Sequence, residues 1–252
     1  MSISPSARRT VRVAASLVAL PVAFLAYSPF PAGAATPTCR GVAATRLVTS
    51  HSADVVDLGN GRNVVVILDA GHTVRTHGGN DLVCGSAGHD VIRAGGGADR
   101  VFAAGGRDTV SGGSGNDVLV GGDGDDTVSG GDGADDVQGD QGDDQLSGED
   151  GNDTVSGGIG NDDEQGDQGD DVVLGGSGDD DEQGNTGDDA VSGGSGDDNL
   201  SGGWGDDTVE GGDGADDCQG GEGADQVDDG NDQGDTTDAG DDLGDVEDGV
   251  DG

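Results

Sequence analysis

The sequence predicts an all-β solenoid, in which short strands and tight turns wind into a stack of flattened coils. A nine-residue repeat keeps its phase without insertion from residue 76 to residue 228. In each unit the fourth position is Gly, the sixth is Asp, and the eighth is almost always apolar. The 252 residues include 55 Gly but only one Trp, one Tyr and three Phe, so a conventional aromatic-rich globular core is excluded.

The repeat is clearest in the centre of the chain. From Gly112 the units are GGSGNDVLV, GGDGDDTVS and GGDGADDVQ, and the same phase counted backwards gives THGGNDLVC at residues 76–84. Seventeen consecutive units fit this phase. Their apolar or Cys eighth positions are Val83, Ile92, Val101, Val110, Leu119, Val128, Val137, Leu146, Val155, Val173, Val191, Leu200, Val209, Cys218 and Val227.

Each unit predicts one tight turn and one short strand. A Gly-rich loop of six residues adopts positive φ angles without a steric penalty, and three strand residues then lead to the next loop. Alternate side chains of a strand face opposite ways, so the eighth residue is expected to point inward, between two solvent-facing neighbours. Two units complete one coil, and aspartates 18 residues apart are therefore expected to stack along one edge at about 4.8 Å.

The stacked aspartates predict metal binding. Two carboxylates this close repel each other unless a cation lies between them, and Ca²⁺ accepts six to eight oxygen ligands in tolerant geometry. Mg²⁺ demands stricter octahedral geometry, and Zn²⁺ would require His or Cys, which do not recur with the repeat. The candidate ligands are Asp81, Asp90, Asp99, Asp108, Asp117, Asp126, Asp135, Asp144, Asp153, Asp162, Asp171, Asp180, Asp189, Asp198, Asp207, Asp216 and Asp225.

These candidates divide into two edges of the coil. The first edge runs from Asp81 to Asp225 and contains eight adjacent pairs, and the second runs from Asp90 to Asp216 and contains seven. With one ion for each pair, the sequence sets a ceiling of about 15 calcium ions.

The units resemble the glycine- and aspartate-rich nonapeptides, G-G-x-G-x-D-x-U-x, of the repeats-in-toxin (RTX, hemolysin-type) calcium-binding proteins. The resemblance is strong over residues 76–228 and weak over residues 49–75. It implies a right-handed parallel β-roll. It also implies that each ion is held by the sixth-position Asp of one loop, its counterpart 18 residues on, and loop carbonyl oxygens.

Residues 1–34 are expected to be a secretory signal peptide. Three Arg precede an apolar run at residues 13–25, and Ala-Gly-Ala at residues 32–34 is a small-x-small cleavage pattern. The run is shorter than a bilayer-spanning helix requires, so we expect secretion and no membrane span after cleavage. An uncleaved anchor is the alternative.

The remaining parts of the chain flank the roll. Residues 35–75 are expected to be a capping region of degenerate coils, because Val56, Val65 and Val74 keep the eighth-position phase. Residues 76–228 are the nonapeptide roll. Residues 229–252 are acidic and poor in apolar side chains, and we expect a disordered tail.

Two eighth positions depart from the apolar pattern. Glu164 and Glu182 are 18 residues apart, so they would stack in adjacent coils of one sheet. Two buried carboxylates are costly. Two hypotheses remain open: a local distortion lets both reach solvent, or the two residues form an extra internal cation site.

The charge of the chain limits its partners. The chain has 53 Asp and Glu against 10 basic residues, a formal net charge of −43, and no basic side chain follows Arg107. Such a surface excludes nucleic acid as a partner. We expect the repeats to be a disordered polyanion without calcium and to fold when calcium neutralises them.

The rarer side chains add smaller expectations. Cys39 and Cys84 are candidates for a disulfide in an oxidising compartment, and Cys218 is expected to be a small buried residue. The four His are scattered and are expected to decorate loops. Trp204 lies in the loop GGWGDD and should report calcium binding nearby.

The leading functional hypothesis is a secreted calcium-binding protein that is not an enzyme, with a structural or adhesive extracellular role. Residues 35–75 are too few for a catalytic domain, and no nucleophile, base or cofactor motif is present in the sequence. The alternatives are an acidic disordered solubiliser, a low-affinity calcium buffer and, ranked lower, an ice-binding β-roll. The sequence does not identify a protein or cell-envelope partner.

Overall fold

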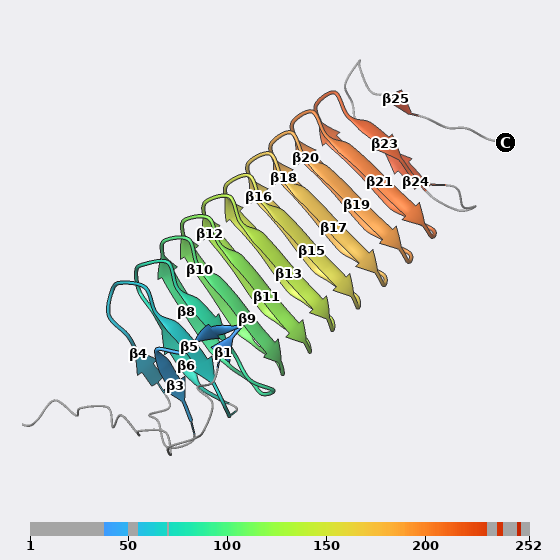
Figure 1. Ribbon diagram of the computed structural model, residues 1–252. Coiled ribbons are helices and arrows are strands. Elements are labelled where there is room, and N and C mark those ends of the chain that lie inside the picture. Colours follow the sequence, from blue (N-terminus) through green and yellow to red (C-terminus); the bar gives the residue numbers. More distant parts are fainter. Residues whose placement is uncertain (1–37, 50–54, 70, 231–235, 239–245, 248–252) are drawn as a thin grey trace, which may run out of the picture. The chain divides into compact units, whose positions relative to one another are not determined.

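The computed structural model describes residues 38–49, 55–69, 71–230, 236–238 and 246–247. Within these residues the chain is all-β, and its parallel strands stack into a solenoid of about ten turns (Figure 1). The fold class expected from the nonapeptide phase is confirmed. The expected signal peptide at residues 1–34 lies outside the described residues.

The strands that precede the regular repeats are short: β1 (Thr38–Cys39), β2 (Val42–Ala43), β3 (Arg46–Val48), β4 (Val55–Asp57), β5 (Val64–Ile67), β6 (Thr73–Arg75) and β7 (Leu82–Cys84). The strands of the regular repeats are longer: β8 (Val91–Gly96), β9 (Arg100–Gly105), β10 (Thr109–Ser114), β11 (Val118–Asp123), β12 (Thr127–Asp132), β13 (Asp136–Gln141), β14 (Gln145–Asp150), β15 (Thr154–Ile159), β16 (Asp163–Gln168), β17 (Val172–Ser177), β18 (Asp181–Thr186), β19 (Ala190–Ser195), β20 (Asn199–Trp204), β21 (Thr208–Asp213) and β22 (Asp217–Glu222). Three short strands end the described chain: β23 (Gln226–Asp228), β24 (Thr236–Asp238) and β25 (Val246–Glu247).

The strands alternate between two parallel sheets. The even-numbered strands from β4 to β24 form one sheet, and the odd-numbered strands from β3 to β25 form the other. Each residue pairs with the residue 18 positions away, as Val110 does with Ile92 on one side and Val128 on the other. The coil of two nonapeptides predicted from the sequence is therefore the structural repeat.

The strands of the regular repeats are longer than the sequence predicts. Each has six residues rather than three, because it continues through the first three residues of the next unit, as β10 does from Thr109 to Ser114. Three residues, such as Gly115 to Asp117, remain for the turn. The strand still bends near its middle, where Gly113 has a φ of 113°. The sequence pattern alone assigns this bend to the loop.

The core is a single column of inward-facing side chains. Every apolar eighth-position residue from Val83 to Val227 is buried, and burying an aliphatic side chain of this size contributes about 1.5–3 kcal/mol. The column divides into two clusters, one ending at Val155 and one beginning at Val173. The break coincides with the two glutamates at eighth positions.

Glu164 and Glu182 remain inside the solenoid. Both side chains are 0% exposed, and their strands keep the regular pairing, with Glu164 opposite Glu182. The hypothesis of a local distortion that brings them to solvent is therefore wrong. Backbone pairing on both sides of each strand holds the register, and a one-residue shift would turn the neighbouring side chains inward instead.

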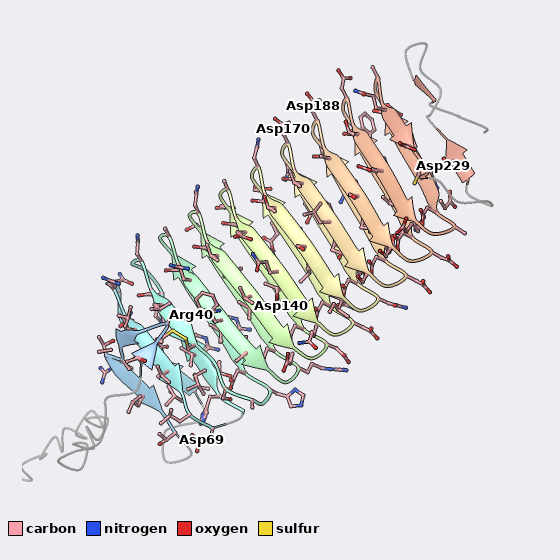
Figure 2. The ribbon with its side chains drawn as sticks, turned by 45° about the vertical axis from the view of Figure 1, so that its right-hand side comes forward. Arg40, Asp69, Asp140, Asp170, Asp188 and Asp229 are labelled. Atoms are coloured by element: carbon pink, nitrogen blue, oxygen red, sulfur yellow. A yellow bond between two sulfur atoms is a disulfide. The ribbon has the colours of Figure 1, made fainter. Side chains whose placement is uncertain are left out.

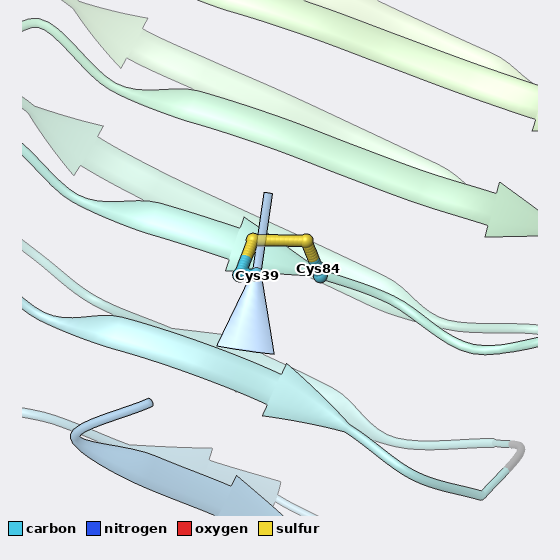
Figure 3. The surroundings of a disulfide bond; sticks show 2 residues. All are labelled: Cys39 and Cys84. Carbon is cyan, nitrogen blue, oxygen red and sulfur yellow. A yellow bond between two sulfur atoms is a disulfide. The ribbon is translucent and has the colours of Figure 1, made fainter. Parts of the chain in front are cut away.

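The N-terminal end of the odd-numbered sheet is covered by an antiparallel hairpin of β1 and β2. A disulfide joins Cys39 in β1 to Cys84 in β7 (Figure 3). The hairpin buries Val64 and Val66, which occupy the outward-facing seventh and ninth positions of their coil. The side chain of Arg40 also lies over the ring of Phe102, with 4.0 Å from its guanidinium carbon to the ring centre.

At the C-terminal end two short strands extend the sheets. β24 pairs in parallel with β22, and β25 pairs in parallel with β23. Most of residues 229–252, for which we expected a disordered tail, lie outside the described residues.

Candidate metal sites along the two edges of the roll

All seventeen sixth-position aspartates lie at the turns and are buried, with 1–4% of each residue exposed. The turns that hold them connect one sheet to the other. On the first edge the turn ends at Asp117, directly before β11, and on the second edge it ends at Asp126, directly before β12. The fixed 18-residue register therefore places aspartates of the same edge on top of one another.

A ladder of hydrogen bonds connects these aspartates. The main-chain N–H of each donates to the carboxylate Oδ1 of the Asp in the next coil, for example from Asp117 to Asp135 at 2.7 Å. All fifteen adjacent pairs make this contact, with N–O distances of 2.6–3.0 Å. The structure thus brings together every pair that was expected from the sequence.

The second carboxylate oxygen, Oδ2, is the atom available to a ligand. It is buried and accepts no hydrogen bond in Asp81, Asp99, Asp108, Asp117, Asp126, Asp135, Asp144, Asp153, Asp162, Asp171, Asp180, Asp189, Asp198 and Asp207. Leaving such an oxygen buried without a partner costs about 1–3 kcal/mol or more. The Oδ2 of Asp90 differs, because the main-chain N–H and the hydroxyl of Ser86 both donate to it.

A glycine at the first position of the unit makes room beside each Oδ2. A β-carbon on Gly130 would lie 2.5 Å from Oδ2 of Asp135 and 2.8 Å from the carbonyl oxygen of Gly148. These contacts are too close for a real side chain, so the absence of a β-carbon leaves the carboxylate and the carbonyl oxygen facing a common space. Both are oxygen ligands of the kind that Ca²⁺ prefers.

A second ladder lies outside the first. At the exposed fifth positions the hydrogen bonds run in the opposite direction, as when the N–H of Asp188 donates to Oδ1 of Asp170 at 3.1 Å. Figure 2 shows these two side chains on successive turns of the same edge. Together the two ladders stack the turns closely, and they crowd further carboxylates around the buried row.

The burial of the inner row raises its pKa values. Desolvation is the main cause for Asp117, whose pKa rises to about 7, and the carboxylates of Asp99 and Asp135 raise it further. The hydrogen bond from the main-chain N–H of Asp99 acts in the opposite direction. The same balance raises the pKa of Asp144 to about 7 and of Asp153 to about 6. Without a cation, these positions therefore favour the protonated acid.

The RTX calcium-binding nonapeptide repeat family matches the chain over residues 75–110, 102–137, 111–146, 129–164, 165–181, 183–218 and 205–227. The chain belongs to this family. Among curated proteins, none matches the chain closely enough to count as a relative.

Membership of the RTX family identifies a calcium-binding repeat protein, and the residues present fit the ion. The buried Oδ2 atoms lack hydrogen-bond donors, and carbonyl oxygens face the same space. Bound calcium would supply positive charge between stacked carboxylates, while Oδ1 keeps its main-chain hydrogen bond. Among the described residues, none forms a helix long and apolar enough to cross a membrane.

Two features of the edges were not anticipated from the sequence. The nonapeptide phase gave no indication that Oδ1 would be occupied by the N–H of the preceding coil. The first-position glycine was also overlooked, although it carries a signal: this position is Gly in every unit from Gly112 to Gly220. It is Ala at Ala94 and Ala103, where a methyl group occupies the space beside Asp99 and Asp108.

Proposed function

We propose that this chain is a secreted RTX protein whose β-roll folds when calcium binds between stacked aspartates, and that it has a structural or adhesive extracellular role. The observation that carries the proposal is the row of buried Oδ2 atoms without hydrogen-bond partners along both edges. In this proposal the seventeen sixth-position aspartates are the metal ligands, with up to about 15 ions between them.

Charge explains why calcium would drive folding. The chain has a formal net charge of −43, and the folded coil brings many of its carboxylates close together in a poorly solvated row. A divalent ion at each pair removes this repulsion, and its binding free energy adds to the free energy of folding. A stack of identical coils that depend on one another favours a cooperative transition.

Secretion and the absence of catalysis belong to the same proposal. Residues 1–34 have the pattern of a signal peptide, and an extracellular compartment supplies both calcium and the oxidising conditions for the Cys39 and Cys84 disulfide. Residues 35–75 are too few for a catalytic domain. Mass spectrometry of the exported protein should find an N-terminus at Ala35, and retention of residues 1–34 would contradict this part.

Far-ultraviolet circular dichroism tests calcium-driven folding. In excess chelator the chain is expected to give a disordered spectrum, and added calcium should produce a cooperative gain of β signal. Magnesium at the same concentration is the control and should produce little change. A β spectrum already present in chelator, or no change at millimolar calcium, would contradict the proposal, and the second outcome would favour a disordered polyanion.

A further inference from the structure

Two acidic side chains occupy the interior of the roll. Glu164 in β16 and Glu182 in β18 are neighbours in the even-numbered sheet, and both are 0% exposed. None of their four carboxylate oxygens has a hydrogen-bond partner. They replace apolar side chains in the core column, so packing does not explain their presence.

Each glutamate reaches the space beside a first-position glycine. A β-carbon on Gly175 would lie 2.1 Å from Oε1 of Glu182, 2.7 Å from Oδ2 of Asp180 and 2.8 Å from the carbonyl oxygen of Gly193. In ordinary coils, such as the one at Gly130, the same space is faced by one carboxylate oxygen and one carbonyl oxygen. Glu182 therefore adds a second carboxylate to this space.

The arrangement recurs one coil earlier. A β-carbon on Gly157 would lie 1.9 Å from Oε1 of Glu164 and 2.4 Å from Oδ2 of Asp162. Both glutamates thus point toward the second edge of the roll, where the aspartate rows already run.

A third carboxylate completes the cluster at Glu182. One oxygen each from Asp180, Glu182 and Asp198 lies within 4.8 Å of the others, and all three residues are buried. The Oδ2 atoms of both aspartates lack hydrogen-bond partners as well. The cluster therefore consists of acceptor oxygens without a donor, which is the ligand set of a hard divalent cation.

An unneutralised cluster is not stable in this position. Burial, together with the charges of Glu182 and Asp180, raises the pKa of Glu164 to about 10. Burial, together with Asp198 and Asp180, raises the pKa of Glu182 to about 9, while its own main-chain N–H acts in the opposite direction without forming a hydrogen bond. Each glutamate must therefore carry a proton or contact a cation.

We propose that Glu164 and Glu182 are calcium ligands that convert two positions on the second edge, between Asp162 and Asp180 and between Asp180 and Asp198, into three-carboxylate sites. These two sites bind calcium more tightly than the two-carboxylate sites of the other coils, because affinity rises with the number of charged ligands. The inference rests on the calcium binding proposed above.

Competition with a chromophoric calcium chelator tests the inference on the full chain. The wild-type chain is expected to withdraw two ions from the chelator before the remaining sites fill. In the Glu164→Val/Glu182→Val variant this early phase should disappear, with a loss of at least tenfold in affinity for the first two ions. Glu210→Gln/Glu222→Gln removes the same charge from exposed positions and should leave the early phase intact.

The valine variant separates ligand loss from core packing. It restores the apolar column, so packing alone would let the roll fold at a lower calcium concentration, which is the opposite of the proposed effect. An unchanged or tighter early phase in this variant would overturn the inference while leaving calcium binding at the edges in place. A wild-type chain that binds no calcium would instead overturn the proposed function.

Infrared spectroscopy gives a second measurement that does not depend on the variant folding. In the calcium-loaded wild-type chain at neutral pH, Glu164 and Glu182 labelled with ¹³C should show only ionised, metal-bound carboxylate bands. A neutral carboxyl band from these labelled residues would mean that a proton occupies the site, and it would overturn the inference.

Discussion

Asp135 donates its main-chain N–H to Oδ1 of Asp153 at 2.7 Å and so leaves Oδ2 of Asp153 buried without a hydrogen-bond partner. One oxygen of the carboxylate therefore fixes the turn, and the other is free for a cation. The same division recurs in adjacent pairs along both edges. It explains how one side chain takes part both in the backbone ladder and in ion binding.

Asp153→Asn tests this division of roles. The amide oxygen of Asn still accepts the N–H of Asp135, but an NH₂ group replaces Oδ2. Because Asp153 belongs to two adjacent pairs, we expect the variant to bind two calcium ions fewer in equilibrium dialysis. Asp150→Asn, at an exposed position of β14, is the control. An unchanged number of ions in Asp153→Asn would contradict the assignment.

Gly148→Ala tests the space beside the carboxylate. A β-carbon on Gly148 would lie 2.5 Å from Oδ2 of Asp153 and 2.7 Å from the carbonyl oxygen of Gly166. We expect weaker calcium binding and a higher calcium midpoint for folding, measured by circular dichroism. Gly59→Ala is the matched control, because no atom lies within 4 Å of a β-carbon at that position. Equal midpoints for the two variants would count against a role for this space.

The metal-free roll should be more stable in acid. Burial raises the folded-state pKa of Asp117 and Asp144 to about 7, above the value of about 3.9 for unfolded Asp. The folded state therefore binds more protons, and this stabilisation is complete below about pH 4 and is lost as the pH rises through about 7. In chelator we expect more β signal near pH 5 than at pH 8. Equal spectra would contradict the raised pKa values.

Calcium should reverse this pH dependence, because calcium and protons compete for the same Oδ2 atoms. Calcium affinity is expected to rise from about pH 5 to about pH 8, since the raised pKa values of Asp153, about 6, and Asp117, about 7, fall between these limits. Titrations followed by Trp204 fluorescence measure it, since this exposed side chain lies beside the turn of the first edge. A calcium affinity that does not change with pH would argue that other groups bind the ion.

Glu149→Gly should stabilise the roll. Glu149 occupies a second position of its unit with a φ of 73°, where its neighbours in the sheet include Gly131 with a φ of 114°. A non-Gly residue pays about 1–2 kcal/mol in this conformation, so we expect the variant to gain about 1 kcal/mol in chemical unfolding of the calcium-loaded chain. Glu210→Gly, at a strand position that carries no positive φ, should instead lose about 0.5–1 kcal/mol.

The disulfide should stabilise the N-terminal end of the roll. Cys39 and Cys84 enclose a separation of 45 residues, and a disulfide of this kind contributes about 2–4 kcal/mol. Reductant is expected to lower the thermal midpoint of the calcium-loaded wild-type chain and to have no effect on Cys39→Ser/Cys84→Ser. An equal effect of reductant on both chains would place its action elsewhere.

The strict phase explains why much of the site could be predicted. Once the period is fixed, the 18-residue coil follows, and Asp135 and Asp153 must stack. The extent of the strands was less predictable, because Gly113 combines a positive φ with continued sheet pairing. A sequence pattern counts such a residue as loop.

Other features depend on three-dimensional packing rather than on periodicity. The contact between the N–H of Asp135 and Oδ1 of Asp153 requires the position of a turn relative to the next coil. The environment of Glu182 was equally open, since the pattern does not reveal whether a coil distorts or keeps its register around a buried charge. The covering of Val66 by the β1 and β2 hairpin also lies outside the repeat.

Crystals of the calcium-loaded chain, measured for anomalous scattering, would test the central claim most directly. We expect two rows of calcium peaks along the two edges of the roll, each peak in contact with sixth-position aspartates 18 residues apart, as between Asp135 and Asp153. Calcium absent from both rows, with Oδ2 protonated or bonded to water instead, would contradict the claim that these stacked aspartates hold the ions.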